Sequence, residues 1–282
     1  MGADPIEVLA QRVCADHGYE FVCACNAGVF KKTFHVRNGG QDRALKLLTR
    51  PPDRERLSRE IAALSACDHT NICKFHDLQT DDVDGTPVIY FVEEFIAGGT
   101  LTDRLATGPL SKADTCTLAL AISEAVAHLA DRRIVHRDIK PDNIMYRADG
   151  TPVLVDLGLA KHLNATSITQ SFAMPGPGTP AYAAPEQLLN DKALIDWRTD
   201  QFGLGVTLSV AALGMHPYSG DMDLDNGCFR IVAQKPHAEE FMEAANTNGL
   251  GLLIRMTEHW PIKRFARPAD LIEAWQRLGV TT

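Results

Sequence analysis

The first hundred residues alternate between short apolar segments and turn-forming residues, a pattern typical of β-strands. Three such segments are separated by glycines, namely Tyr19–Cys25, Thr33–Arg37 and Arg43–Leu48. A fourth, Val88–Val92, consists wholly of apolar residues and is expected in the interior of a sheet. This part of the chain is therefore predicted to be rich in strands.

Two helices are expected in the same region. One opens at residues 51–53, because the apolar positions after it share a helical face, namely Leu57, Ile61 and Leu64. The segment Asp4–His17 has spaced apolar residues, namely Ile6, Val8, Leu9 and Val13. It is predicted to form a short helix docked on the strand-rich part, and a partner for it is left open.

The pattern becomes helical after residue 97. An apolar stripe is formed by Leu118, Ile122, Ala125, Val126 and Leu129. Two short strands, Ile144–Tyr146 and Val153–Val155, are joined by the hairpin signal Asp149-Gly150. The uncharged stretch Phe202–Met215 suits a buried helix. The sequence predicts an α+β fold with an N-terminal segment at 1–18, a small β-rich lobe at 19–96 and a larger α-helical lobe at 97–282.

Composition narrows the function classes. The 282 residues are 45% hydrophobic and 23% charged, with a net charge of −8. The acidic balance argues against a broad nucleic-acid surface or a polybasic membrane anchor. No apolar run of ~18 residues and no basic leader followed by an apolar segment is seen. We expect a cytoplasmic protein with no nucleic-acid or membrane partner, and its oligomeric state is left open.

The seven cysteines are an odd number and show no CxxC spacing; they are Cys14, Cys23, Cys25, Cys67, Cys73, Cys116 and Cys228. One interpretation is a metal site formed by Cys23 and Cys25 with His17 or His35. The other is a set of small apolar residues in a reducing cytosol, and the spacing rules favour it.

The strongest chemical signal is residues 136–143, which read HRDIKPDN. Other segments accompany it in a fixed order: Lys46 ending RALK, Glu60 in the following helix, Asp156-Leu157-Gly158, GTPAYAAPE at 178–186, Asp200 with Gly203 and Gly205, and Arg264. This set resembles the eukaryotic-like (Hanks-type) serine/threonine protein kinase family over nearly the whole chain. The resemblance implies a bilobal protein-kinase-like fold that binds ATP and Mg²⁺ and phosphorylates proteins.

The resemblance also assigns the catalytic residues. Asp138 would accept or orient the proton of the substrate hydroxyl, and Lys140 would stabilise charge on the transferring phosphate. Thr179 together with Lys140 is the combination found in serine/threonine kinases. Protein substrates with Ser or Thr hydroxyls, including the chain's own activation loop, are therefore expected.

Four further residues would hold the nucleotide phosphates and the metal. Lys46 would grip phosphate oxygens, and Glu60 would pair with Lys46 and fix its direction. Asn143 and Asp156 would supply the oxygen ligands that Mg²⁺ prefers.

The glycine-rich loop is eroded in this chain. Residues 26–33 lie over the family's G-x-G-x-x-G-x-V pattern, with Asn26, Gly28 and Thr33 as the expected nucleotide contacts. Only Gly28 is retained among the glycines. Lys31 replaces the third one, and it would add phosphate affinity, crowd the loop or remain a solvated surface lysine.

The adenine contacts are also read from the resemblance. Glu94 would offer its carbonyl and Ile96 its N–H and C=O, with Ala44 above and Met145 below the ring. Glu93 would then occupy the gatekeeper position, where a carboxylate must find a partner or take up a proton, because an unpaired buried charge is costly.

Several other polar residues of these motifs are interpreted as structural. We expect Glu186 and Arg264 to form a buried ion pair, Asp200 to bind backbone amides of the catalytic loop, and His136 to pack and hydrogen-bond rather than react. The loop between Asp156 and Glu186 is either an activation loop whose phosphate pairs with Arg137 or an unmodified polar loop. Its candidate phosphorylation sites are Thr166, Ser167, Thr169 and Ser171.

Two other functions are considered beside an active kinase. The eroded glycine loop and Leu157 in place of phenylalanine are compatible with a pseudokinase that binds nucleotide or protein. A small-molecule kinase is disfavoured, because such enzymes lack the segment of residues 179–186 that would seat a peptide.

Overall fold

The computed structural model describes residues 4–27, 31–48, 65, 67–83, 85–157 and 181–280. Their contacts divide the chain into two compact units. The first contains the described residues up to 68 together with 73–97, and the second contains 69–72 and the described residues from 98 onward.

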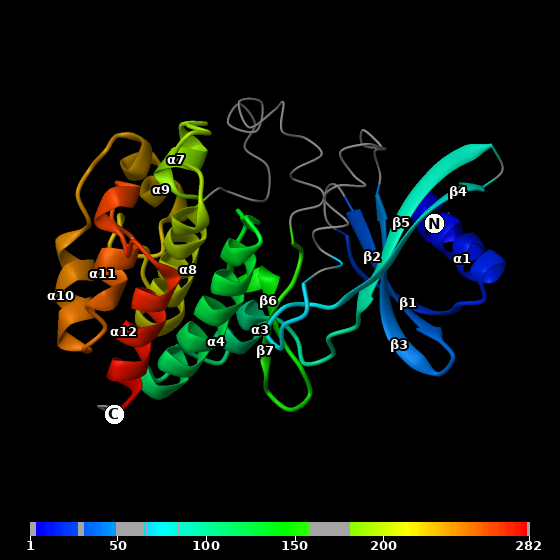
Figure 1. Cartoon of the computed structure of the whole chain (residues 1–282), viewed down its shortest axis with the longest axis horizontal. Coiled ribbons are helices and arrows are strands. Elements are labelled where there is room, and N and C mark those ends of the chain that lie inside the picture. The colour runs from blue at the N-terminus through cyan, green and yellow to red at the C-terminus, as the bar shows by residue number, and fades with distance from the viewer. Residues whose placement is uncertain are drawn as a thin grey trace. The chain divides into compact units, whose positions relative to one another are not determined.

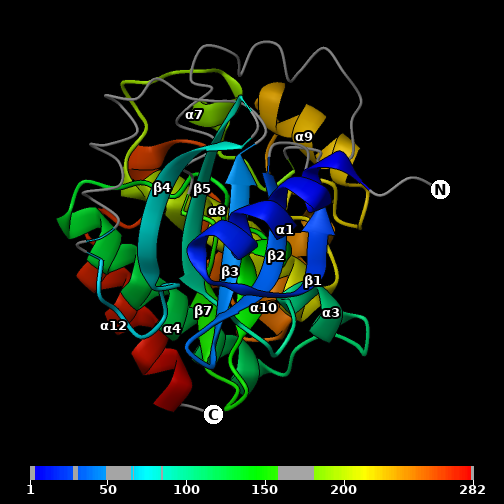
Figure 2. The same ribbon diagram turned by 90° about the vertical axis from the view of Figure 1, so that its right-hand side faces the viewer.

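The first unit is one antiparallel sheet with a helix on one face (Figure 2). The strands lie in the order β1-β2-β3-β5-β4. Their bounds are β1 Glu20–Ala27, β2 Lys31–Asn38, β3 Gln41–Leu48, β4 Phe75–Val83 and β5 Thr86–Glu94. The β4 strand is missing from the sequence prediction. It is an edge strand with mostly polar, exposed positions, so no apolar run marks it.

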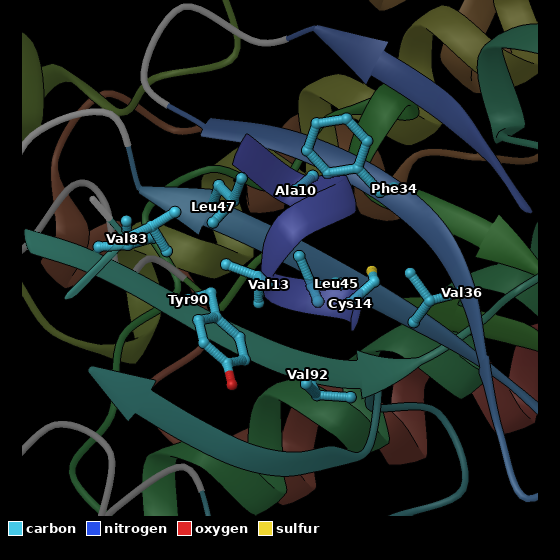
Figure 3. Close-up of a cluster of buried hydrophobic side chains, with 11 residues drawn as sticks. Ala10, Val13, Cys14, Phe34, Val36, Leu45, Leu47, Val83, Tyr90 and Val92 are labelled. Atoms are coloured by element: carbon cyan, nitrogen blue, oxygen red, sulfur yellow. The ribbon is translucent and has the colours of Figure 1, made fainter. Parts of the chain in front are cut away.

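Helix α1, Pro5–His17, covers one face of this sheet (Figure 3). Side chains alternate along a strand, so every second residue of each strand points to the same face. The residues on the face toward α1 include Phe34, Leu45 and Tyr90. Ala10, Val13 and Cys14 of α1 pack against them. The helix begins at Asp4, whose side chain caps the Ile6 amide and pairs with Lys32. The opposite face of the sheet carries the next residues along each strand, including Thr33, Ala44, Lys46 and Glu93.

The second unit is mostly helical (Figure 1). Its helices are α3 Leu101–Leu105, α4 Lys112–Asp131, α7 Pro185–Leu188, α8 Trp197–Leu213, α9 Leu224–Val232, α10 Glu239–Thr247, α11 Leu252–Met256 and α12 Pro268–Val280. The short strands β6 Ile144–Tyr146 and β7 Pro152–Leu154 form a hairpin. Its turn contains Gly150 at φ 85°. The α+β class predicted from the sequence is confirmed.

Helix α8 forms the centre of the second unit. It packs against α4, α10 and α11, and all positions from Thr199 to Ala211 are buried. Gly205 permits the close approach of α11, because a Cβ there would lie 2.8 Å from the Thr257 side chain. No helix in the described part of the chain is long and apolar enough to cross a membrane.

The packing of α1 can be tested with two identical substitutions in one helix. Val13 has 0% exposure and Val8 has 38%. Val13→Ala should lower the free energy of unfolding by about 2 kcal/mol, because it leaves a cavity. Val8→Ala should change it by less than about 0.5 kcal/mol. Urea unfolding measures both, and equal effects would show that α1 does not pack as described.

Candidate active site

The carboxylate of Asp200 on α8 fixes the backbone of the loop after α4. Its Oδ2 accepts a hydrogen bond from the His136 amide at 2.8 Å, and its Oδ1 accepts one from the Arg137 amide at 2.7 Å. Arg137 has a φ of 63°, a left-handed conformation that non-glycine residues rarely adopt. The two bonds hold this uncommon turn in place and confirm the expected role of Asp200. Burial raises the pKa of Asp200 to about 7, and the two amides act in the opposite direction.

His136 forms a second connection within the loop. The imidazole is 1% exposed. Its Nδ1 accepts from the Asp138 amide at 3.2 Å, so its Nε2 carries the proton and donates to the Val155 carbonyl at 3.0 Å. The expectation that His136 packs and hydrogen-bonds is confirmed. The loop is thereby attached to the segment that contains Asp156.

Two predicted site residues, Asn143 and Lys140, contact the Asp138 side chain. Asn143, in the 3-10 turn Pro141–Asn143, donates from Nδ2 to the Asp138 carbonyl at 2.7 Å and to Asp138 Oδ2 at 3.0 Å. Lys140 Nζ lies 3.4 Å from the same Oδ2. Asp138 is half-buried, and its carboxylate faces the Lys140 ammonium and the Asn143 amide. These two contacts hold the carboxylate in one orientation.

The backbone of Asn143 places Asp156 next to this group. The Asn143 carbonyl accepts from the Val155 amide at 2.9 Å, and Asp156 follows directly with a φ of 64°. Because Asn143 Nδ2 is directed at Asp138, its amide oxygen is the atom that would face a cation. A carboxylate and an amide oxygen suit Mg²⁺, so the donor set fits that ion. Met145 lies two residues after Asn143, in β6, where it is paired with Val153 of β7.

The first unit presents Lys46 on the face of the sheet opposite α1. Its Nζ lies 2.5 Å from Glu93 Oε2 and 5.7 Å from the centre of the Phe91 ring. Lys46 and Glu93 are both 6% exposed. The expected partner, Glu60, lies outside the described residues. We expected a partner for the carboxylate of Glu93, and the Lys46 ammonium is that partner.

The remaining predicted residues fall into two groups. Thr33 lies opposite Lys46 on the adjacent strand, and Ala44 lies opposite Glu93. Asn26 lies in β1 and Glu94 ends β5. Ile96 follows β5 and is buried. Gly28 and Thr179 lie outside the described residues, as do the four candidate phosphorylation sites. Among the residues that the structure describes, no three His, Cys, Asp or Glu side chains form a metal cluster.

The predicted buried ion pair is confirmed. Arg264 donates from Nη1 and Nη2 to the two oxygens of Glu186 at 2.8 and 3.0 Å. The two side chains are 0% and 1% exposed. Thr199 of α8 also donates to Glu186 at 2.8 Å. Helix α7, which contains Glu186, is therefore attached to α8.

Two residues with supporting contacts are missing from the sequence analysis. Gln187 donates to the Arg137 carbonyl at 2.9 Å and accepts from the Ala184 amide at 3.1 Å. His216 donates from Nε2 to the Ala181 carbonyl at 3.0 Å and accepts from the Tyr218 amide at 3.2 Å. Both attach the segment that begins at Ala181 to the rest of the unit. A polar side chain after a motif gives no sequence signal for such a contact.

His216 makes the stability of the second unit dependent on pH. Burial lowers its pKa to about 4 from the ordinary 6.5. The unfolded chain therefore binds the extra proton first, and the stability present above pH 6.5 is lost as the pH falls toward 4. Between pH 7 and pH 5 the wild type should lose about 2 kcal/mol more than His216→Gln. Urea unfolding at both pH values measures this, and parallel losses would contradict a buried neutral His216.

Comparison with known proteins identifies the family of the chain. Residues 26–275 match the protein kinase domain. The chain is 29% identical over 217 residues to the serine/threonine-protein kinase PrkC of Bacillus subtilis, covering 77% of this chain and 32% of the relative. The chain is also 32% identical over 221 residues to the DNA damage-responsive serine/threonine-protein kinase RqkA of Deinococcus radiodurans. This match covers 73% of this chain and 31% of the relative.

A eukaryotic relative is covered more fully. The serine/threonine-protein kinase cds1 of Schizosaccharomyces pombe is 29% identical over 276 residues, which is 91% of this chain and 58% of that protein. The matched region thus spans less than two thirds of the length of each of these relatives. With its sheet, its helical unit and the loop around Asp138, the chain belongs to the protein kinase domain family and is homologous to serine/threonine protein kinases.

Proposed function

We propose that this chain is a serine/threonine protein kinase that transfers the γ-phosphate of ATP to Ser and Thr hydroxyls of proteins, its own activation loop included. The observation that carries the proposal is the grouping of Lys140 and Asn143 around the Asp138 carboxylate at 3.4 and 3.0 Å. A carboxylate held in one orientation beside a cation suits proton acceptance next to developing phosphate charge.

Each residue of this group has one task in the proposal. Asp138 accepts the proton of the attacking hydroxyl, and its orientation is set by the Asn143 amide. Lys140 stabilises negative charge on the transferring phosphoryl group. Asn143 and Asp156 would hold Mg²⁺ through their oxygens, where the ion would neutralise phosphate charge. Thr179 together with Lys140 favours serine and threonine hydroxyls, as the resemblance implies.

The resemblance assigns the nucleotide contacts residue by residue. Lys46 binds phosphate oxygens, supported by Glu60, and Asn26, Gly28 and Thr33 are further nucleotide contacts. Ala44 and Met145 flank adenine. The backbone groups of Glu94 and Ile96 bind its edge. The cytoplasmic location expected from the sequence stays a prediction.

The relatives support the choice of hydroxyl. PrkC and RqkA are named serine/threonine kinases, and Lys140 is present here as in that class. A nucleotide-binding module without transfer is the alternative, and it is separated from the proposal by a direct assay of phosphate transfer.

The proposal predicts a large difference between two neighbouring aspartates. Asp138→Asn should lower phosphate transfer to a generic protein substrate by a factor of about 10³ or more, because the proton acceptor is lost. Asp142→Asn is the matched control, since Asp142 is exposed and its Oδ1 accepts from Thr102 at 2.8 Å. Radiolabelled ATP and phosphoamino-acid analysis measure rate and hydroxyl type.

Two results would contradict the proposal. If Asp138→Asn kept the activity of the wild type and of Asp142→Asn, Asp138 would have no role in the reaction. Phosphotyrosine as the main product would exclude the serine/threonine assignment. Far-ultraviolet circular dichroism establishes that both variants are folded before rates are compared.

A further inference from the structure

Two opposite charges are paired on the face of the sheet that the proposal assigns to the nucleotide. Lys46 Nζ and Glu93 Oε2 are 2.5 Å apart, and the two side chains are 7% and 8% exposed. The Phe91 ring centre lies 5.7 Å from the ammonium, and Cys73 Sγ lies 3.8 Å from the carboxylate. Attraction between charges is strong in such a setting, because little water screens it.

The register of the sheet shows where the lysine is directed. Thr33, Lys46 and Phe91 lie side by side in one row across β2, β3 and β5. His35, Ala44 and Glu93 form the neighbouring row, two residues away along each strand. Diagonal neighbours of this kind are within reach of a long side chain. The ammonium of Lys46 is therefore drawn from its own row toward the row of Ala44.

This direction matters for the two ends of a nucleotide. In the proposed function Ala44 covers adenine, and Lys46 and Thr33 serve the phosphates. An ammonium held by Glu93 is therefore held toward the base and away from the phosphates. The carboxylate also places a negative charge close to where phosphate charge would be bound, and like charges repel.

We propose that Glu93 competes with the nucleotide phosphates for Lys46. In this proposal, which rests on the proposed function, phosphate oxygens must displace a buried carboxylate before they reach the lysine. Glu93 thus lowers the affinity for phosphorylated nucleotides and sets the nucleotide concentration at which the domain is occupied. The base itself is not involved, so the effect scales with the negative charge of the ligand.

The charge of the ligand gives a sharp test. Calorimetric titration of the full chain with ADP and with adenosine should be compared for the wild type and Glu93→Gln, which keeps the shape and removes the charge. ADP should bind the variant about fivefold more tightly or better, as typical couplings between sites reach. Adenosine, which carries no phosphate, should bind both proteins equally.

A matched control separates local from general charge effects. Glu20→Gln removes a carboxylate from the same sheet at a site where the side chain is 67% exposed and 3.7 Å from Arg37. It should leave both affinities unchanged. Glu93→Thr is a second variant without the charge, and it should also tighten ADP binding if Glu93→Gln does not fold.

The outcomes separate this inference from the proposed function. Unchanged or weaker ADP binding to a folded Glu93 variant overturns the competition and leaves Glu93 as a support for Lys46. A change of the same size for adenosine also overturns it, since Glu93 would then act on the base. Absence of ADP and adenosine binding in the wild type and in both Glu93 variants would instead contradict the proposed function itself.

Discussion

The catalytic loop depends on one buried carboxylate. Asp200 accepts hydrogen bonds from two successive amides, those of His136 and Arg137. An amide in that position would direct its NH₂ group at one of the two N–H donors, so the matched pair of hydrogen bonds would be lost. The left-handed turn at Arg137 is costly by itself. It is held by Asp200, whose helix α8 is buried from Thr199 to Ala211. The backbone that precedes Asp138 is thus held by a residue that has no chemical role.

The loop is held from several sides at once. His136 connects it to Val155, and Gln187 connects the Arg137 carbonyl to the segment after Ala181. Buried polar networks of this kind specify one arrangement when every member is satisfied. The acceptor carboxylate of Asp138, by contrast, remains half-buried. The second unit therefore combines a buried hydrogen-bonded support with a more accessible carboxylate, and the proposed phosphoryl transfer would use this preorganisation.

The sequence predicts the fold class and the catalytic loop because both leave strong local signals. The short apolar segments that become β2 and β3, the apolar α8 and the motif at residues 136–143 can all be recognised in the sequence. The polar edge strand β4 cannot, because its mostly polar and exposed positions leave no apolar run in the sequence. The contact of Lys46 with Glu93 could not be predicted either. The sequence required a partner for a carboxylate at that position, but the choice of Lys46 arises from the diagonal register of β3 and β5.

The intact mass of the purified full chain, measured before and after incubation with Mg²⁺ and ATP, tests the central claim most directly. The account predicts added steps of about 80 Da, each a phosphoryl group on a hydroxyl. Fragment analysis should place them on Ser or Thr. A chain that binds the nucleotide yet keeps its mass, and leaves an added protein substrate unmodified, would contradict the account and identify a nucleotide-binding module instead.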